Sequence, residues 1–200
     1  SRQKMKTKYF SIVLFILFIT NTYSQNSSKN EYYNGEFKWN IVIPENFQYV
    51  NSEEQKRLQK KGEDAVEKTF GEEVINQSKN IFAFNNGKFN YFDSSYQPFD
   101  TEIDGDYKTT CKAVNNILYE TIKTQAKNSK IDTISSTEII DKLEFQKFSL
   151  KAEFQNGITI NMIMYSRLFD KKEFSVNIIF IDEKKGQLML ESWRNSTFSE

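Results

Sequence analysis

Histidine is absent from this chain, and cysteine occurs once, as Cys111. Without histidine the chain cannot activate a nucleophile through a Ser-His-Asp or Cys-His arrangement, cannot build a histidine metal site and lacks the usual general base near neutral pH. A single cysteine cannot form a disulfide within the chain, and we expect Cys111 to pack in the core from one face of a helix. We therefore predict a protein that is not an enzyme, with no catalytic residues, no cofactor and no bound metal.

Proline and glycine are also scarce, with two and seven residues, which argues against a flexible or low-complexity chain. By contrast, 18 phenylalanines and ten tyrosines provide enough apolar bulk for a core. Residues 1–24 contain four basic residues and no acidic one, so the rest of the chain has 23 basic and 27 acidic residues, a net charge of −4. A weakly acidic chain without a basic stripe is not typical of nucleic-acid-binding proteins, and we expect no nucleic-acid partner.

Only one long apolar run occurs, from Tyr9 to Ile19. Lys6 and Lys8 precede it and small residues follow at Thr22-Tyr23-Ser24, a pattern typical of a secretory signal peptide. The run is short for a membrane span of about 20 residues, although an uncleaved anchor is the alternative. We expect residues 1–24 to be upstream residues plus a signal peptide, residues 25–36 a polar leader and residues 37–200 a single domain. The mature protein would be periplasmic or extracellular, without stable membrane insertion after cleavage.

The clearest structural signal is a predicted meander of three antiparallel strands at residues 143–181, in which apolar residues alternate with polar ones. Its apolar positions are all even-numbered: Phe148, Leu150, Ala152, Phe154, Ile158, Ile160, Met162, Met164, Leu168, Phe174, Val176, Ile178 and Phe180. To keep these side chains on one face, the first turn must be a three-residue loop with a bulge at Gly157 that pairs Phe154 with Ile158. The same reasoning predicts a second three-residue turn at Asp170-Lys171-Lys172, with Leu168 opposite Phe174.

Two further features of the meander yield predictions. Leu143 and Phe145 alternate in the opposite phase, which indicates a bulge or bend at Gln146-Lys147. The odd-numbered face carries both polar and apolar residues, so we expect a helix or a partner to cover part of it.

The rest of the chain alternates strand and helix signals. We expect a strand at 37–43, a helix from a capping box at Ser52 to about Val74, a hairpin at 81–92, a loop at 93–106 and a helix at 107–127. A strand at 131–140 and a turn at Asp141-Lys142 lead into the meander. After it, Asp182 caps a last helix with Gly186, Met189, Leu190 and Trp193 on one face. This order predicts an α+β fold, with a central antiparallel sheet of about six strands flanked by helices in an α/β/α sandwich.

Two polar segments are candidate sites. Residues 100–106, with the pattern Asp100-x-Glu102-x-Asp104-Gly105-Asp106, are similar to the opening of a calcium loop, but Cys111 stands where the bidentate glutamate should be. In the alternative, Asp104 or Asp106 caps the following helix. The second segment is a basic cluster, for which we expect a solvated helix face, the alternative being contact with an acidic partner: Lys56, Arg57, Lys60 and Lys61.

The order of elements resembles the PsbP-like family, named for an extrinsic subunit of photosystem II. The resemblance rests on Ile43-Pro44-Glu45-Asn46-Phe47 at the entry, the 107–127 helix, the return strand, and residues 143–198 with Glu191-Ser192-Trp193 near their end. A Ran-binding nuclear import factor and several exported bacterial proteins share this fold. The resemblance implies an α/β/α sandwich and no catalytic residues, since the family mostly binds or stabilises partner proteins. The helix at 51–74 and the loop at 93–106 depart from it.

Three functions remain open at this point. The first is an exported, non-enzymatic module that binds an unknown protein partner, either as an accessory protein of the bacterial cell envelope or as an immunity-type factor. The second is a carrier of a small apolar ligand between sheet and helix, lined by Met162 and Met164 and the phenylalanine-rich face, although these residues could simply form the core. The third is a carboxylate-based hydrolase that uses a pair chosen from Glu138, Asp141, Glu144 and Glu153.

Overall fold

The computed structural model describes residues 30–199. The predicted signal peptide and its cleavage site lie outside the described residues. The elements are, in order, β1 (Glu31–Asn34), β2 (Trp39–Val42), β3 (Gln48–Tyr49), α1 (Ser52–Phe70), β4 (Lys79–Asn85), β5 (Tyr91–Pro98), α2 (Thr101–Asp104), α3 (Tyr107–Gln125), β6 (Lys130–Ile140), β7 (Leu143–Glu153), β8 (Thr159–Phe169), β9 (Lys172–Phe180), α4 (Glu183–Arg194) and β10 (Thr197–Phe198).

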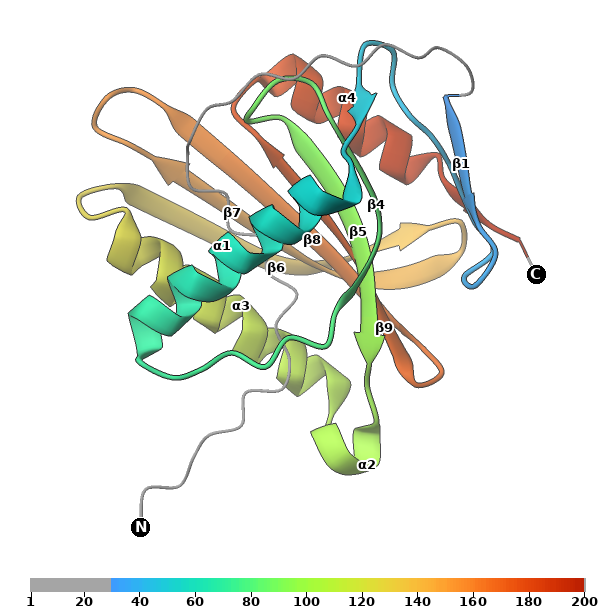
Figure 1. Cartoon of the computed structure of the whole chain (residues 1–200), viewed down its shortest axis with the longest axis horizontal. Helices are drawn as coiled ribbons and strands as arrows, with labels where there is room; N and C mark the ends of the chain where they lie inside the picture. Colours follow the sequence, from blue (N-terminus) through green and yellow to red (C-terminus); the bar gives the residue numbers. More distant parts are fainter. Residues whose placement is uncertain (1–29, 200) are drawn as a thin grey trace.

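Seven strands form one antiparallel sheet in the spatial order β3-β4-β5-β9-β8-β7-β6, and β1-β2-β10 form a second, small sheet. Figure 1 shows α1 and α3 across one face of the large sheet, with α4 and the small sheet on the other side. The predicted α+β sandwich is therefore confirmed, although the central sheet has seven strands rather than about six. No helix in the described part of the chain is long and apolar enough to cross a membrane.

The face toward α4 and the small sheet holds an aromatic core. Trp39 of β2 and Trp193 of α4 are fully buried, and their ring centroids lie 6.0 Å apart. Phe174 of β9 lies 5.0 Å from Trp39 and 6.3 Å from Trp193. Phe198 of β10 also packs on this cluster. The predicted apolar face of the last helix and its cap at Asp182 are both confirmed, since all four face residues are buried: Gly186, Met189, Leu190 and Trp193.

The other face of the large sheet packs against α1 and α3. Ala65 and Val66 of α1 and Leu118 of α3 are buried against apolar residues of the central strands. The α1–α3 pair is also joined by a hydrogen bond of 3.1 Å from the Gln125 side-chain amide to the carbonyl oxygen of Ala65. Both faces of the sheet are therefore covered, as expected for the odd-numbered face of the meander. The cover over the odd-numbered residues of β7 and β8, such as Phe145 and Tyr165, is α4 and the small sheet, whereas Ile179 of β9 packs on the α1 and α3 side.

The first turn of the meander has the predicted form. Phe154 N–H donates to the carbonyl oxygen of Ile158, and Gly157 has φ +82°. Ala152 pairs with Ile160, as the three-residue loop requires. Glycine fits this position because L-residues with a side chain rarely adopt positive φ.

The predicted second turn is wrong. It contains two residues, Asp170 and Lys171, and pairs Phe169 with Lys172, so Phe174 lies opposite Arg167 and not Leu168. The even-numbered residues of β9 consequently face α4, whereas those of β7 and β8 face α1 and α3. The prediction failed because it assumed one buried face; with both faces buried, parity alone does not decide the register.

The predicted bulge at Gln146-Lys147 is also wrong. The pairing of β6 with β7 runs without a register shift from Leu143 to Glu153. The change of phase in the sequence has another cause, since Phe145 faces the aromatic core on the α4 side and Phe148 faces α3.

Helix α1 differs from the prediction at its N-cap residue and at its last residue. Its N-cap is Asn51 and not Ser52, because the Asn51 side chain accepts a hydrogen bond of 2.9 Å from Glu54 N–H. Gln55 instead donates its side-chain amide to the carbonyl oxygen of Val50 at 2.8 Å. The helix ends at Phe70 and not near Val74, because Gly71 adopts the left-handed conformation with φ +70°.

Two segments expected to be irregular are strands. Residues 31–34, within the expected polar leader, form β1 and pair with β2. Residues 93–98, expected to be a loop, continue β5 between β4 and β9. The polar residues of this part of β5 are buried, including Asp93, Ser95 and Gln97, and for that reason their strand lacks an apolar signal.

Candidate functional site

An apolar pocket of about 680 Å³ opens between the C-terminal ends of α1 and α3 and the large sheet. Its floor comes from three neighbouring strands: Leu150 and Ala152 of β7, Ile160 and Met162 of β8, and Ile179 of β9. The volume falls within the range of about 300–1,000 Å³ that is typical of small-molecule sites. The geometry therefore defines a candidate binding site for an apolar ligand.

The walls of this pocket are apolar as well. Ile122 comes from α3, Phe89 from the turn between β4 and β5, Phe154 from the loop after β7 and Ile181 from the position after β9. A ligand that covered these side chains would be favoured by about 25 cal/mol for each Å² of apolar surface removed from water.

The pocket lies where both helices end. Gly71 terminates α1, and α3 ends at Gln125. Glu153 ends β7 and Thr159 begins β8, and Figure 1 shows the hairpin between these strands extending past α1 and α3. The floor at Ala152 carries only a methyl group, which leaves the space above it open.

Polar side chains gather at the mouth of the pocket. Lys68 and Thr69 belong to the last turn of α1, whereas Thr124 lies in the last turn of α3 and Lys127 follows its C-cap. Lys68, Thr124 and Lys127 are exposed to solvent. Among the described residues that line the pocket there is no aspartate and no glutamate. The mouth is therefore positively charged, although the chain beyond residue 24 carries a net negative charge.

Met162 and Met164, the residues named for an apolar carrier, have different positions. Met162 is buried in the core beside α1 and α3 and also lines the pocket. Met164 packs against the same core but does not line the pocket. Met162 is thus both a core residue and a residue of the pocket lining.

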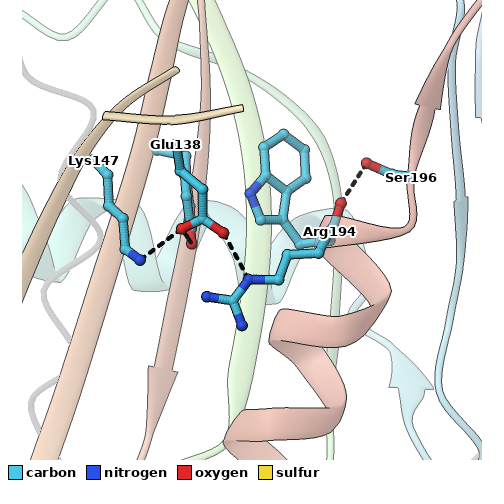
Figure 2. A network of polar contacts seen from close by, with 6 residues as sticks. Glu138, Lys147, Arg194 and Ser196 are labelled. Carbon is cyan, nitrogen blue, oxygen red and sulfur yellow. Dashed lines mark hydrogen bonds and ion pairs between the residues drawn. The ribbon is translucent and has the colours of Figure 1, made fainter. Parts of the chain in front are cut away.

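A second polar site joins β6, β7, β8 and α4 around the carboxylate of Glu138 (Figure 2). Glu138 accepts hydrogen bonds from Lys147 Nζ at 2.6 Å, from the Tyr165 hydroxyl at 2.9 Å and from Arg194 Nε at 2.7 Å. Burial alone would raise the pKa of Glu138, but these hydrogen bonds outweigh it and lower the pKa to about 2. A carboxylate held ionised in this way is a poor general acid or base near neutral pH, and the contacts tie α4 to the sheet.

The other carboxylates proposed for a hydrolase have separate structural contacts. Asp141 accepts a hydrogen bond of 2.6 Å from Phe198 N–H, and Glu153 forms an exposed ion pair of 2.6 Å with Lys151. Glu144 is exposed. The structure therefore provides no evidence for a catalytic carboxylate pair among these residues.

Buried polar groups lie on β5 and β9, on the face of the large sheet that packs against α1 and α3. The Asn177 side-chain amide donates a 2.7 Å hydrogen bond to Asp93, and Gln97 donates one of 2.5 Å to Glu173. Burial raises the pKa of Asp93 to about 7 and outweighs the hydrogen bond from Asn177, which lowers it. Burial likewise raises the pKa of Glu173 against its hydrogen bonds. These carboxyls can therefore keep a proton at a pH where exposed carboxyls are ionised.

Two acidic side chains of residues 100–106 cap the N-termini of helices. Asp100 caps α2 and Asp106 caps α3, where its carboxylate accepts from Thr109 N–H at 2.9 Å. Asp104 accepts from Asp100 N–H at 2.7 Å. The alternative in which Asp106 caps the following helix is confirmed. Within residues 30–199 there is no group of three or more His, Cys, Asp or Glu side chains that could hold a metal ion.

Cys111 lies on α3 and is buried, as expected, with its Sγ atom 3.7 Å from the Ser166 hydroxyl oxygen. Burial raises the pKa of its thiol to about 11, so it stays protonated and unreactive near neutral pH.

No family model matches this sequence, and no curated protein matches it. Comparison with solved structures shows the PsbP-like fold, an α+β sandwich, and confirms the resemblance of the element order. One such structure is CyanoP, the cyanobacterial PsbP of Synechocystis sp. PCC 6803, with 6% sequence identity and a TM-score of 0.55, covering 90% of this chain and 98% of that chain. At this identity the match shows the fold alone.

A second structure found in the same comparison is LpqN, involved in cell envelope biogenesis of Mycobacterium tuberculosis. It is 10% identical with a TM-score of 0.41, and the match covers 86% of this chain and 91% of that chain. A fold alone does not determine a function, which depends on the residues of the site.

Proposed function

We propose that the protein is an exported, non-enzymatic binding protein whose ligand is an apolar molecule held in the pocket between α1, α3 and the large sheet. The observation that carries the proposal is the open apolar pocket of about 680 Å³. The sequence favoured a protein-binding module, with the carrier as the alternative. The pocket reverses that order, because it supplies a site with a defined volume and lining.

The side chains available for chemistry support a binding role. The described lining residues of the pocket include no carboxylate, cysteine or tyrosine, and the whole chain has no histidine. Glu138, outside the pocket, is engaged by three donors. Non-catalytic binding is thus the function that these residues fit best.

Export is supported by the sequence of residues 1–24, with lysines before one apolar run and small residues after it. An exported protein that shields an apolar molecule from water would serve as an accessory or carrier protein of the cell envelope.

A titration with N-phenyl-1-naphthylamine, a neutral dye that fluoresces in apolar surroundings, tests the pocket. We expect saturable binding at one site, and a loss of affinity of at least about tenfold in Ala152→Phe, whose ring fills the floor. Ala113→Phe is the matched control, because Ala113 is exposed on α3 and does not line the pocket. If Ala152→Phe does not fold, Ile181→Glu places a charge on the wall at a residue that is 40% exposed. Absence of dye binding, or equal affinity in folded pocket variants, would contradict the proposal.

A partner protein is the second candidate, and the edge strand β6 favours it. Within residues 30–199 this strand of eleven residues pairs only with β7, and Ile134 and Ile139 are 67% and 70% exposed. An exposed edge strand can accept an extended strand of another protein. Affinity capture from the native envelope should then recover one partner with the wild type and with Ile103→Lys, a control at an exposed isoleucine on α2, but not with Ile134→Lys. Equal recovery with both variants would remove the edge from consideration.

A further inference from the structure

We infer that the ligand is a single-chain anionic amphiphile, such as a fatty acid, with its chain in the apolar pocket and its head group at Lys68 and Lys127. This inference rests on the proposed function, because it specifies the ligand of the same pocket. Its basis is the separation of chemistry within the site, with an apolar floor on the strands and both cations at the helix ends.

The two lysines have no partner within the described chain. No carboxylate of residues 30–199 forms an ion pair with Lys68 or Lys127. Other lysines of the same helices are paired, since Lys60 contacts Asp64 at 2.9 Å and Lys123 contacts Glu120 at 3.9 Å. The ammonium groups at the mouth are therefore available to a ligand.

The partial negative charges of the two helix C-termini repel an anion and offset part of the positive charge of the lysines. The C-terminus of a helix acts as roughly half a negative charge, and both α1 and α3 end at the pocket. Two lysines carry two full positive charges, so the mouth remains positive by about one charge. Glu72 and Glu73 follow α1 but do not line the pocket. A cationic head group would meet repulsion here, and a neutral one would leave the lysines unpaired.

The pocket volume favours one chain rather than a whole membrane lipid. At about 680 Å³ the pocket is of the size used for small ligands, and its mouth lies between two helix ends. A free amphiphile with one tail and one charged end matches this shape and charge.

Competition against bound N-phenyl-1-naphthylamine at pH 8 separates the classes of ligand. The probes are dodecanoate, dodecanol and dodecyltrimethylammonium, each below the concentration at which it forms micelles. We expect dodecanoate to displace the dye at a concentration about three- to tenfold lower than dodecanol, as two exposed charge contacts allow, and the cation to be the weakest. Salt should reduce this preference, because exposed charges are screened.

The variant Lys68→Gln/Lys127→Gln should lose the preference for dodecanoate while it still binds dodecanol and the dye. The double variant Lys56→Gln/Lys123→Gln changes the net charge equally without touching the pocket and should keep the preference. Equal displacement by all three probes would overturn the anionic ligand and leave the apolar pocket standing. Displacement by vesicles of phosphatidylglycerol but not by dodecanoate would overturn a free single-chain ligand. Dye binding without displacement by any probe would overturn the amphiphilic ligand, and a folded protein that binds no dye would overturn both proposals.

Discussion

Asp93 of β5 and Asn177 of β9 lie directly opposite each other in the large sheet and share a hydrogen bond of 2.7 Å inside the core. Burial raises the pKa of Asp93 to about 7, whereas its pKa in the unfolded chain is near the ordinary 3.8. The folded protein therefore holds a proton between about pH 4 and pH 7 that the unfolded chain has lost. Because the native state binds more protons in this window, stability falls as the pH rises through it.

The first prediction follows from this pair. Between pH 4.5 and pH 7.5 the free energy of unfolding of the wild type should fall, with Asp93 contributing on the order of 2–4 kcal/mol. In Asp93→Asn that contribution should vanish and the pH profile should flatten. Urea unfolding at several pH values measures this. The pH profile of Glu173→Gln is compared with that of Asp93→Asn, because burial also raises the pKa of Glu173. An unchanged slope in folded Asp93→Asn would show that this carboxyl is ionised across the window.

The second prediction concerns the three donors around Glu138. Glu138→Gln removes the charge that Lys147, Tyr165 and Arg194 share, and should lower the free energy of unfolding at pH 7 by about 1–3 kcal/mol. Since the pKa of Glu138 is lowered to about 2, its contribution is complete above pH 4.5 and is lost as the pH falls toward 2. The difference from the wild type should therefore shrink in acid. The control is Glu153→Gln, which breaks an exposed ion pair and should cost less than about 0.5 kcal/mol. Equal effects of the two variants at pH 7 would count against this role of Glu138.

The third prediction concerns Gly186 in α4. A Cβ atom added at this position would clash with the Phe180 ring. Three ring carbons would lie closer to it than Cβ atoms approach other atoms in real proteins. Gly186→Ala should therefore destabilise the protein by about 1–3 kcal/mol, even though alanine favours helix by about 1 kcal/mol. Thermal unfolding measures the effect. Phe180→Leu in the Gly186→Ala background should recover part of the loss, and Lys184→Ala, at an exposed position of α4, should be neutral or stabilising. A Gly186→Ala protein as stable as the wild type would show that α4 can move away from β9.

The fourth prediction is a stabilising change in the turn between β6 and β7. Asp141 and Lys142 have φ of +44° and +66°, values that favour Asp-Gly in such a turn. Lys142→Gly should raise the free energy of unfolding by roughly 0.5–1 kcal/mol, because glycine adopts positive φ without strain. Lys151→Gly, within β7, should do the opposite. A loss of stability in Lys142→Gly would mean that the lysine side chain contributes more than its backbone strain costs.

Local signals in the sequence were sufficient for much of the fold. Gly157 determined the first turn of the meander, and the apolar spacing of α3 and α4 determined which helix faces are buried. The second turn failed because Phe174 and Met162 face different layers, and alternation cannot distinguish a strand buried on one face from one buried on both. The end of β5 was missed because Asp93 and Gln97 are buried with polar partners, contrary to the usual pattern.

The candidate site was predictable only in part. Met162 and the apolar strands suggested a space between sheet and helix. The volume of that space depends on where α1 and α3 end relative to β7 and β8, which no local pattern encodes. Lys68 and Lys127 are 59 positions apart in the sequence and meet at one mouth only through the packing of the two helices.

Native mass spectrometry of the protein recovered from its host without detergent tests the central claim most directly. We expect one small apolar or amphiphilic molecule per chain, released by organic solvent, and a ligand-free chain when the same preparation is made from Ala152→Phe. Ala113→Phe should retain the ligand. A wild-type protein that is ligand-free, and that stays ligand-free after incubation with a lipid extract of the host, would contradict the claim that this pocket is a binding site.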